Sequence, residues 1–482
     1  TTRPTVAISS DTGTLNAAQT AIITLTFSED PGNSLTWDGN VGDLVVTGGT
    51  LGALSTTSNP LTRTAILTPA TGVSSGTANV AVNLNSYTDA AGNLGLEAVA
   101  GVTDKSSNIT VNTTPATLSS VVISSADNIQ NNLLNAGDVV YVTATYSEAV
   151  TLGAGAGAPS LKLNIGGTEV DALYASGSGS TALVFAYTVL AAQTDVNGIS
   201  IVASNVGSNI ASNMSNPTFN LSGRTLTDTA GNTAVNVFSA VADNASYLVD
   251  TTAPTLVSIA SSQSTFLSGQ TATITFTFSE DPGITFTWDG TTGDVSLSNG
   301  TMSAISGTGL TRTAVFTPSN NLDTRTASIT ASSGTYQDTA GNNGVAGATP
   351  SLSLDTLKPS ISSVAISSAT GAQNNTLNAG DTANISMVFS ETVNLNVAGG
   401  SPTVSLLVGS STVLATYVSG AGSNTLVFTT TMVAGQTDTD GVAISLNALA
   451  LNGAVLTDVA GNAALITSTA VANNASYKVD TT

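Results

Sequence analysis

Apolar residues alternate with threonine or serine along several short stretches of the chain. Clear examples are residues 21–27, 139–146 and 271–278, where largely every second position is apolar. A period of two predicts strands with one buried face, because successive side chains of a strand point to opposite sides of the sheet. Clusters of Asn, Gly, Asp and Ser recur about every 8–12 residues and provide turns. No segment carries the apolar stripe of an amphipathic helix. The pattern therefore predicts an all-β fold.

One type of module occurs twice, and we call it type A. The motif Thr-Phe-Ser-Glu-Asp-Pro-Gly at residues 26–32 returns at residues 277–283. Trp-Asp-Gly at residues 37–39 likewise returns at residues 288–290. Internal repeats with this spacing indicate an array of similar domains.

A second module, type B, follows each type A module. Leu-Asn-Ala-Gly-Asp at residues 134–138 returns at residues 377–381, and Asn-Ala-Ser-Tyr at residues 244–247 returns at residues 474–477. The copies are 243 residues apart at the first motif and 230 at the second, so the first type B module carries an insertion. We expect it in the Asn/Ser-rich run near residues 205–216, as a long loop.

The modules alternate in the order A-B-A-B, and each internal junction has a proline a few residues after an Asn or Asp. The predicted boundaries are 1–112 (A), 113–250 (B), 251–355 (A) and 356–482 (B). Roughly seven short strands in about 100 residues or more are typical of an immunoglobulin-like sandwich. We therefore predict a tandem array of four Ig-like β-sandwich domains. The Thr-Thr that opens the chain also ends it, so we expect the sequence to be cut at a repeat boundary.

Composition narrows the chemistry. The 482 residues include 30 Asp and Glu against 9 Lys and Arg, giving a net charge of −21, and they include neither Cys nor His. Disulfides, zinc fingers, a Cys nucleophile and a Ser-His-Asp triad are thereby excluded. The scarcity of basic residues argues against nucleic acid as a partner. No stretch approaches the roughly 20 apolar residues of a membrane span. We expect a non-enzymatic protein without nucleic-acid partners and without direct membrane insertion.

Acidic residues recur at equivalent places in every module. Each module has a Ser-Glu that we expect to end its second strand, an Asp-x-Ala-Gly-Asn loop before its last strand, and in most cases an Asp at its end. Asp281, which follows Glu280, could add a ligand, or Glu-Asp-Pro-Gly could simply start a tight turn. The candidate metal ligands are Glu29, Asp89, Asn93, Glu148, Asp228, Asn232, Asp250, Glu280, Asp281, Asp338, Asn342, Asp355, Glu391, Asp458, Asn462 and Asp480. Strand counting in a seven-stranded sandwich brings the Glu and the loop to one pole, beside the incoming linker.

Carboxylates gathered at one pole repel unless a cation neutralises them. Ca²⁺ fits this set, because it binds about six to eight oxygens from carboxylates, amides and backbone, whereas Mg²⁺ tolerates irregular oxygen cages poorly. Without His and Cys, zinc and copper are disfavoured. The alternative is that Asp-x-Ala-Gly-Asn is a turn motif only. Four copies, each matched to a Glu, favour calcium; Asn112 replaces the acid at the first junction, which predicts the weakest site there.

Other residues support weaker hypotheses. Trp37 and Trp288 could stack on a sugar, although a packed position is more usual for such residues. Arg63 and Arg312 are expected to form local salt bridges. Paired carboxylates could serve a glycosidase, but that activity needs one special pair in a cleft rather than acids repeated in every module.

The motifs themselves resemble known repeats. Phe-Thr-Phe-Ser-Glu-Asp at residues 276–281, Thr-Asp-Ala-Ala-Gly-Asn at residues 88–93 and Val-Asp-Thr-Thr-Ala-Pro at residues 249–254 resemble bacterial Ig-like tandem repeats of giant calcium-dependent surface adhesins. The type B motifs resemble repeats of large cyanobacterial swimming-associated surface proteins. This resemblance implies an extracellular, calcium-dependent rod that extends an adhesive or anchoring domain away from a bacterial cell.

Three functions remain open from the sequence. The first is an extender segment of a secreted or surface-attached adhesin, stiffened by Ca²⁺. The second is a self-assembling subunit of an extracellular filament, sheath or surface layer, and the third is a carbohydrate-binding or hydrolytic protein. Expected partners are neighbouring repeats of the same chain or identical subunits, with a surface or polysaccharide ligand bound through domains outside this sequence.

Overall fold

The computed structural model describes residues 2–83, 85–96, 106, 108–203, 219–347 and 350–482. Every regular element in these residues is a β-strand, which confirms the all-β prediction. The described part of the chain has no helix long and apolar enough to cross a membrane. The insertion predicted near residues 205–216 lies outside the described residues.

The chain divides into two compact units, Thr1–Thr252 and Ala253–Thr482. Within the described residues, the first unit has hydrophobic cores between Val6 and Val111 and between Ala116 and Val249. The second unit likewise has a core on each side of the linker at Asp355. Each core falls within one predicted module, although the module boundaries themselves stay a prediction.

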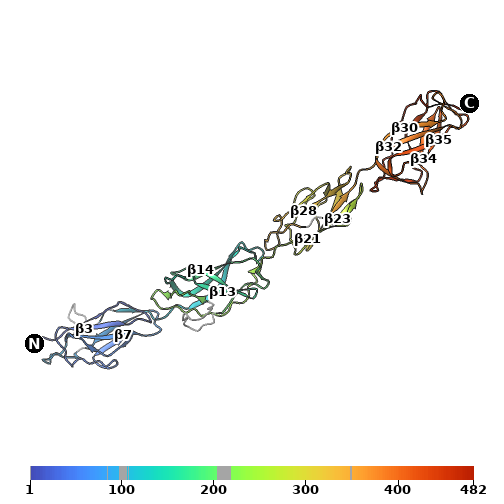
Figure 1. Cartoon of the computed structure of the whole chain (residues 1–482). Helices are drawn as coiled ribbons and strands as arrows, with labels where there is room; N and C mark the ends of the chain where they lie inside the picture. The colour runs from blue at the N-terminus through green and yellow to red at the C-terminus, as the bar shows by residue number, and fades with distance from the viewer. Residues whose placement is uncertain (1, 84, 97–105, 107, 204–218, 348–349) are drawn as a thin grey trace. The chain divides into compact units, whose positions relative to one another are not determined.

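The first type A module packs two antiparallel-rich sheets face to face. One sheet has the order β1 (Val6–Ser10), β3 (Ala21–Phe27), β7 (Thr62–Pro69) and β5 (Gly49–Leu51), with β6 (Ser55–Thr56) also on β7. The other has the order β2 (Thr14–Leu15), β9 (Ile109–Val111), β8 (Gly76–Val82) and β4 (Leu44–Thr47). In β3, which lies beside β7 in Figure 1, Ile23 and Leu25 are fully buried while Ile22 and Thr26 face solvent, as the period of two predicts.

The second type A module repeats this plan. Its larger sheet has the order β21 (Leu256–Ser261), β23 (Ala272–Phe278), β26 (Thr311–Pro318) and β25 (Gly300–Met302). The opposite layer contains β22 (Thr265–Phe266), β29 (Leu352–Leu354) and β27 (Arg325–Ala327), and the pair β24 (Val295–Leu297) and β28 (Ile329–Ala331).

The type B modules have longer strands. In the first, the large sheet has the order β10 (Leu118–Asp127), β12 (Val139–Leu152), β15 (Ser180–Thr188), β14 (Thr168–Ser176), β13 (Ser160–Ile165) and β17 (Ser200–Ile201), with β18 (Phe219–Asn220) on β13 and β19 (Leu226–Asp228) on β12. The small sheet has the order β11 (Leu133–Leu134), β20 (Leu248–Asp250) and β16 (Thr194–Asp195).

The second type B module matches the first. Its large sheet has the order β30 (Ile361–Thr370), β32 (Thr382–Asn396), β35 (Ser423–Thr431), β34 (Ser411–Ser419), β33 (Thr403–Val408) and β37 (Ala443–Ala450), and β38 (Val455–Thr457) pairs with β32. Its small sheet has the order β31 (Thr376–Leu377), β39 (Lys478–Asp480) and β36 (Thr437–Asp438).

One strand prediction is wrong in the type B modules. Ser-Glu does not end the second strand there: β12 continues through Glu148, and β32 continues through Glu391. On one edge, β12 pairs with β10 up to Tyr146 and with β19 from Val150 onward. On its other edge β15 remains the partner, with a register shift between Thr145 and Val150. This exchange of partners is the physical reason for the longer strand. It also brings Glu148 beside the residue that ends β19, Asp228.

Candidate metal centre

All four Asp-x-Ala-Gly-Asn loops form a turn held by hydrogen bonds to the loop aspartate. In three loops the alanine N–H donates to its Oδ1, and in the fourth Gly461 N–H does so. In the first type B module, Asp228 Oδ1 accepts from the backbone N–H of Ala230 and of Asn232, at 2.9 and 2.8 Å. Asn232 Nδ2 donates to Asp228 Oδ2 at 2.9 Å, and Gly231 between them has a φ of 88°. The turn chemistry predicted for the motif is therefore present. Equivalent bonds from Asn to Asp side chains join residues 93 and 89, 342 and 338, and 462 and 458.

The aspartates that begin these loops are all buried, with exposed fractions of 6% or less. A buried carboxylate needs compensation, and hydrogen bonds from its own loop supply part of it. These hydrogen bonds fix the loop aspartate in place, so the glutamate of the Ser-Glu motif lies near a carboxylate that cannot move away.

One acidic pole lies inside the second unit and includes the linker residue Asp355, Glu391 and Asp458. Asn462 Nδ2 donates to Asp458 Oδ2 at 2.7 Å and to Asp355 Oδ1 at 3.3 Å. Burial raises the pKa of Glu391 to about 7, and the charges of Asp458 and Asp355 add to this shift. Burial and the charge of Asp458 also raise the pKa of Asp355. Glu391 Oε1 is buried and has no hydrogen-bond partner among the described residues. The predicted Glu, loop Asp and linker Asp are thus close enough to interact electrostatically.

Asp323 is a fourth acid at this pole, and the sequence analysis missed it. Its charge contributes to the raised pKa of both Glu391 and Asp355. Asp323 lies in the turn before β27, outside the repeated motifs, so comparison of the repeats gave no signal for it. Only its place in the fold brings it to the pole.

The corresponding pole in the first unit is less acidic. Burial, followed by the charge of Asp228, raises the pKa of Glu148. The linker position is occupied by Asn112, whose Oδ1 accepts from the backbone N–H of Thr114 at 3.1 Å. One carboxylate is therefore replaced by a neutral amide, in the place where the sequence predicts the weakest site.

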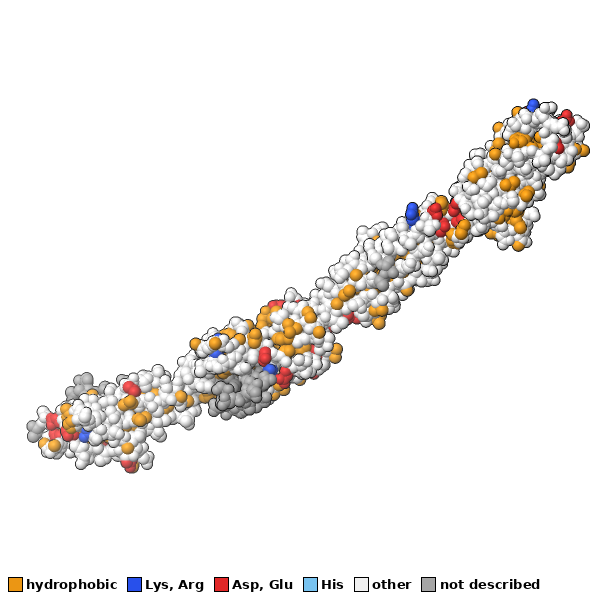
Figure 2. All heavy atoms as spheres, in the orientation of Figure 1, with side chains coloured by type: hydrophobic (Ala, Val, Ile, Leu, Met, Phe, Trp, Pro, Cys, Tyr) orange, Lys and Arg blue, Asp and Glu red, His pale blue; other side chains and the backbone are white. Residues whose placement is uncertain are grey.

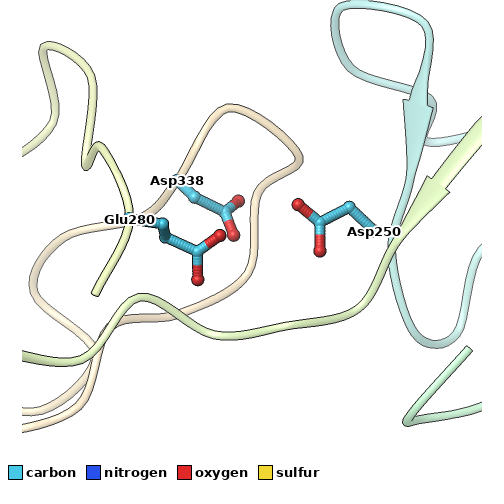
Figure 3. A group of neighbouring side chains, drawn as sticks. All are labelled: Asp250, Glu280 and Asp338. Carbon is cyan, nitrogen blue, oxygen red and sulfur yellow. The ribbon is translucent and has the colours of Figure 1, made fainter. Parts of the chain in front are cut away.

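The type A modules also bring their Glu and loop Asp together. Carboxylate oxygens of Glu280 and Asp338 lie within 4.8 Å of each other, and both side chains are drawn in Figure 3. In the first module, hydrogen bonding, chiefly from the Asn93 side chain and with a smaller contribution from Glu29, holds the pKa of Asp89 below its usual value. Glu29 Oε1 also accepts from Thr2 Oγ1 at 2.6 Å.

Three further candidates form hydrogen bonds or an ion pair of their own. Asp250, also labelled in Figure 3, ends β20 in the first unit, and its Oδ1 accepts from the N–H of Thr252 at 2.9 Å. Asp480 ends β39 and accepts from the side chain and backbone of Thr482, which lowers its pKa. Asp281 forms an ion pair with Arg312 at 3.0 Å.

Both local salt bridges predicted for arginine are confirmed. Arg63 pairs with Asp30 at 3.4 Å, and Arg312 pairs with Asp281. Trp288 is packed in a hydrophobic core with an exposed fraction of 9%, and its Nε1 donates to Met302 O. Trp37 is half-buried and donates in the same way to Leu51 O. These contacts match the packed position that is more usual for such residues.

Comparison with known proteins matched two segments of the chain to a domain family and found solved structures of low sequence identity. No curated protein matches the chain. Among solved structures, the Escherichia coli adhesin FdeC is 12% identical with a TM-score of 0.26, covering 73% of this chain and 96% of its own. Invasin, described as a bacterial integrin-binding protein, is 13% identical with a TM-score of 0.23, covering 92% of this chain and 75% of its own. Such low scores supply no evidence on what this chain binds. Residues 1–111 and 250–356, close to the two predicted type A modules, match the family model described as bacterial Ig-like domain.

Proposed function

We propose that this chain is a non-enzymatic extender segment of a secreted or surface-attached bacterial adhesin, and that Ca²⁺ bound at its module poles and junctions stiffens it. The observation that carries the proposal is the acidic pole of Asp355, Glu391 and Asp458. Carboxylates from a linker, a strand and a loop interact electrostatically there, and Asn462 Nδ2 donates to both Asp458 Oδ2 and Asp355 Oδ1. Figure 2 shows acidic side chains gathered near the linker between the third and fourth cores, with a basic side chain beside them.

A bound cation would neutralise the carboxylates of this pole. The ion pairs at Arg63, Lys162 and Arg312 in the described residues do not include its carboxylates. The raised pKa of Glu391 indicates that full ionisation is unfavourable without a positive charge nearby. Oxygen-only donors in an irregular arrangement suit Ca²⁺. Asp355, Glu391 and Asp458 would hold the ion, and equivalent ligands in the other modules would be Glu29 with Asp89, Glu148 with Asp228, and Glu280 with Asp338.

Binding at this place has a mechanical consequence. Asp355 belongs to the linker, whereas Glu391 and Asp458 belong to the following module, so an ion held by all three ties the linker to the pole. The same residue types flank the other junctions in the sequence, where Asp250 precedes the second type A module. Repetition of these acids in every module fits a spacer, which has many equivalent joints. The family match to residues 1–111 and 250–356 supports repeated Ig-like domains.

The test compares the full chain in millimolar Ca²⁺, in Mg²⁺ and in EGTA. Calcium should raise the melting temperature and narrow the range of shapes seen by small-angle scattering, while sedimentation velocity reports a monomer. Free calcium at 100 times the Kd adds about 2.7 kcal/mol of stability for one site.

Matched variants assign this effect to the pole. Asp355→Asn should weaken the calcium response, whereas Glu169→Gln, which removes one exposed charge from β14, should leave it unchanged. Identical melting and scattering in calcium and EGTA would reduce the acidic loops to turns and refute the proposal.

A further inference from the structure

In the first unit, the loop asparagine of the type B module contacts the type A module that precedes it. Asn232 Oδ1 accepts from the backbone N–H of Ala17 at 2.7 Å, and its Nδ2 donates to Asn112 O at 3.0 Å. Asn16 Nδ2 adds a third bond, to Ala230 O at 3.1 Å. Ala17 lies in the turn after β2, and Asn112 follows β9, so one amide links a turn, a linker and a loop.

The second unit contains the same joint at equivalent residues. Asn462 Oδ1 accepts from the N–H of Ser268 at 2.7 Å, and its Nδ2 donates to Asp355 O at 2.9 Å. Leu267 occupies the place of Asn16, and a Cβ on Gly461 would lie 3.4 Å from Leu267 Cδ1. The side chain at this place thus makes an apolar contact in the second joint (Leu267) and a hydrogen bond in the first (Asn16). Both joints keep the two hydrogen bonds made by Asn232 or Asn462.

Hydrogen bonds within its own loop already restrain the asparagine that bonds across the joint. In each type B loop its Nδ2 also donates to the loop aspartate, as it does in the type A loops, where Asn93 bonds to Asp89. Asn232 and Asn462 are 4% and 3% exposed, while Asn93 is only half-buried. A side chain whose rotamer is already held loses little conformational entropy when it forms further bonds. Burial then protects these bonds from competition with water.

We propose that Asn232 and Asn462 form a metal-independent latch that fixes each type A module to the type B module after it. Each such A-B pair is then held together at its joint without metal. The two compact units of the chain, Thr1–Thr252 and Ala253–Thr482, each contain one such pair. The latch goes beyond calcium stiffening, because its bonds use backbone groups and an amide, and therefore persist after chelation.

Distance measurement in the full chain tests the latch. Because the chain has no Cys, two introduced cysteines carry spin labels at unique sites. Ile22 on β3 and Leu173 on β14 are 49% and 50% exposed and lie on either side of the first joint. With Ile22→Cys and Leu173→Cys, double electron–electron resonance in EGTA should give one narrow distance distribution. Val315→Cys on β26 and Leu414→Cys on β34 report the second joint in the same way.

Variants separate the effect of the bonds across the joint from the effect of the bond within the loop. Asn232→Ala should broaden the distribution at the first joint in EGTA at least twofold, and Asn462→Ala should do so at the second joint only. Asn93→Ala removes the same turn amide from a loop outside both joints and should change neither.

Two results would overturn the latch. One is a wild-type distribution that is broad in EGTA and narrows only in calcium, which would show that metal makes the joint. The other is an unchanged narrow distribution in Asn232→Ala. Failure of the chain to bind calcium, with narrow distributions in EGTA, would refute the proposed calcium stiffening and support the latch, so the two proposals can fail separately.

Discussion

At the scale of the residue, we predict that Glu391 couples the proposed calcium binding to proton release. Its pKa of about 7 means that it is largely protonated at pH 6, and a bound cation requires the ionised form. We predict that calcium binding near pH 6 releases up to about one proton per ion at this site, and that affinity falls as the pH is lowered below 7. Calorimetric titration in buffers of different ionisation enthalpy measures the proton release directly.

Without metal, the ionised form of Glu391 lowers the stability of the folded state instead of supporting it. The pKa of Glu391 is raised above its ordinary value of 4.5 in the folded state, so its contribution to stability is fully present below pH 4.5. That contribution is lost as the pH rises through about 7. Glu391→Gln should therefore melt above the wild type in EGTA at pH 8 and below it in calcium. Proton release that is equal in wild type and variant would contradict the assignment to Glu391.

At the scale of the element, the strand pattern could be predicted where a single partner and a single buried face decide it. β3 follows the alternation of Ala21–Phe27 because one side of its sheet covers the core. The ends of β12 and β32 could not be predicted, because around the glutamate β12 exchanges β10 for β19 and β32 exchanges β30 for β38. Local sequence carries no mark of that exchange. The latch was equally hidden, since Ala17 and Ser268 contribute only backbone N–H groups.

The loop that carries the latch depends on its glycine. Gly231 has a φ of 88°, and a Cβ there would lie 2.9 Å from Asn16 Nδ2. Gly223, in the same module, has a φ of 78° with nothing within 4 Å of an added Cβ. Alanine in such a backbone conformation costs about 1–2 kcal/mol. We predict that Gly223→Ala loses this amount and that Gly231→Ala loses about 1 kcal/mol more, because the Asn16 hydrogen bond is displaced.

Thermal unfolding of the two glycine variants, in EGTA, measures this difference. Both substitutions act on one module, so the size of the cooperative unit is the same and the melting temperatures compare directly. Equal melting temperatures would show that Asn16 yields to the methyl group without loss. Adding Asn16→Leu, the residue type found at the second joint, should remove the extra cost in Gly231→Ala.

At the scale of the whole molecule, the number of calcium sites should follow the linker residues. Repeats in the sequence were sufficient to predict the acidic poles, but the strength of each pole depends on neighbours brought in by the fold, such as Asp323. The two A-to-B junctions differ at one position that the sequence does show. Asn112 stands at the first, where Asp355 stands at the second.

Asn112→Asp should therefore create a stronger calcium site at the first joint. An aspartate there keeps an oxygen to accept from Thr114 N, as Asn112 Oδ1 does at 3.1 Å, and adds a carboxylate to the pole of Glu148 and Asp228. In EGTA the added charge should lower the melting temperature of the first unit, because like charges repel. In calcium the order should reverse, and calorimetry should count about one more tightly bound ion per chain. The backbone oxygen of residue 112 still accepts from Asn232, so the spin-label distance distribution across the joint should stay narrow in both conditions. Unchanged calcium binding in Asn112→Asp would show that the linker residue does not take part in the site.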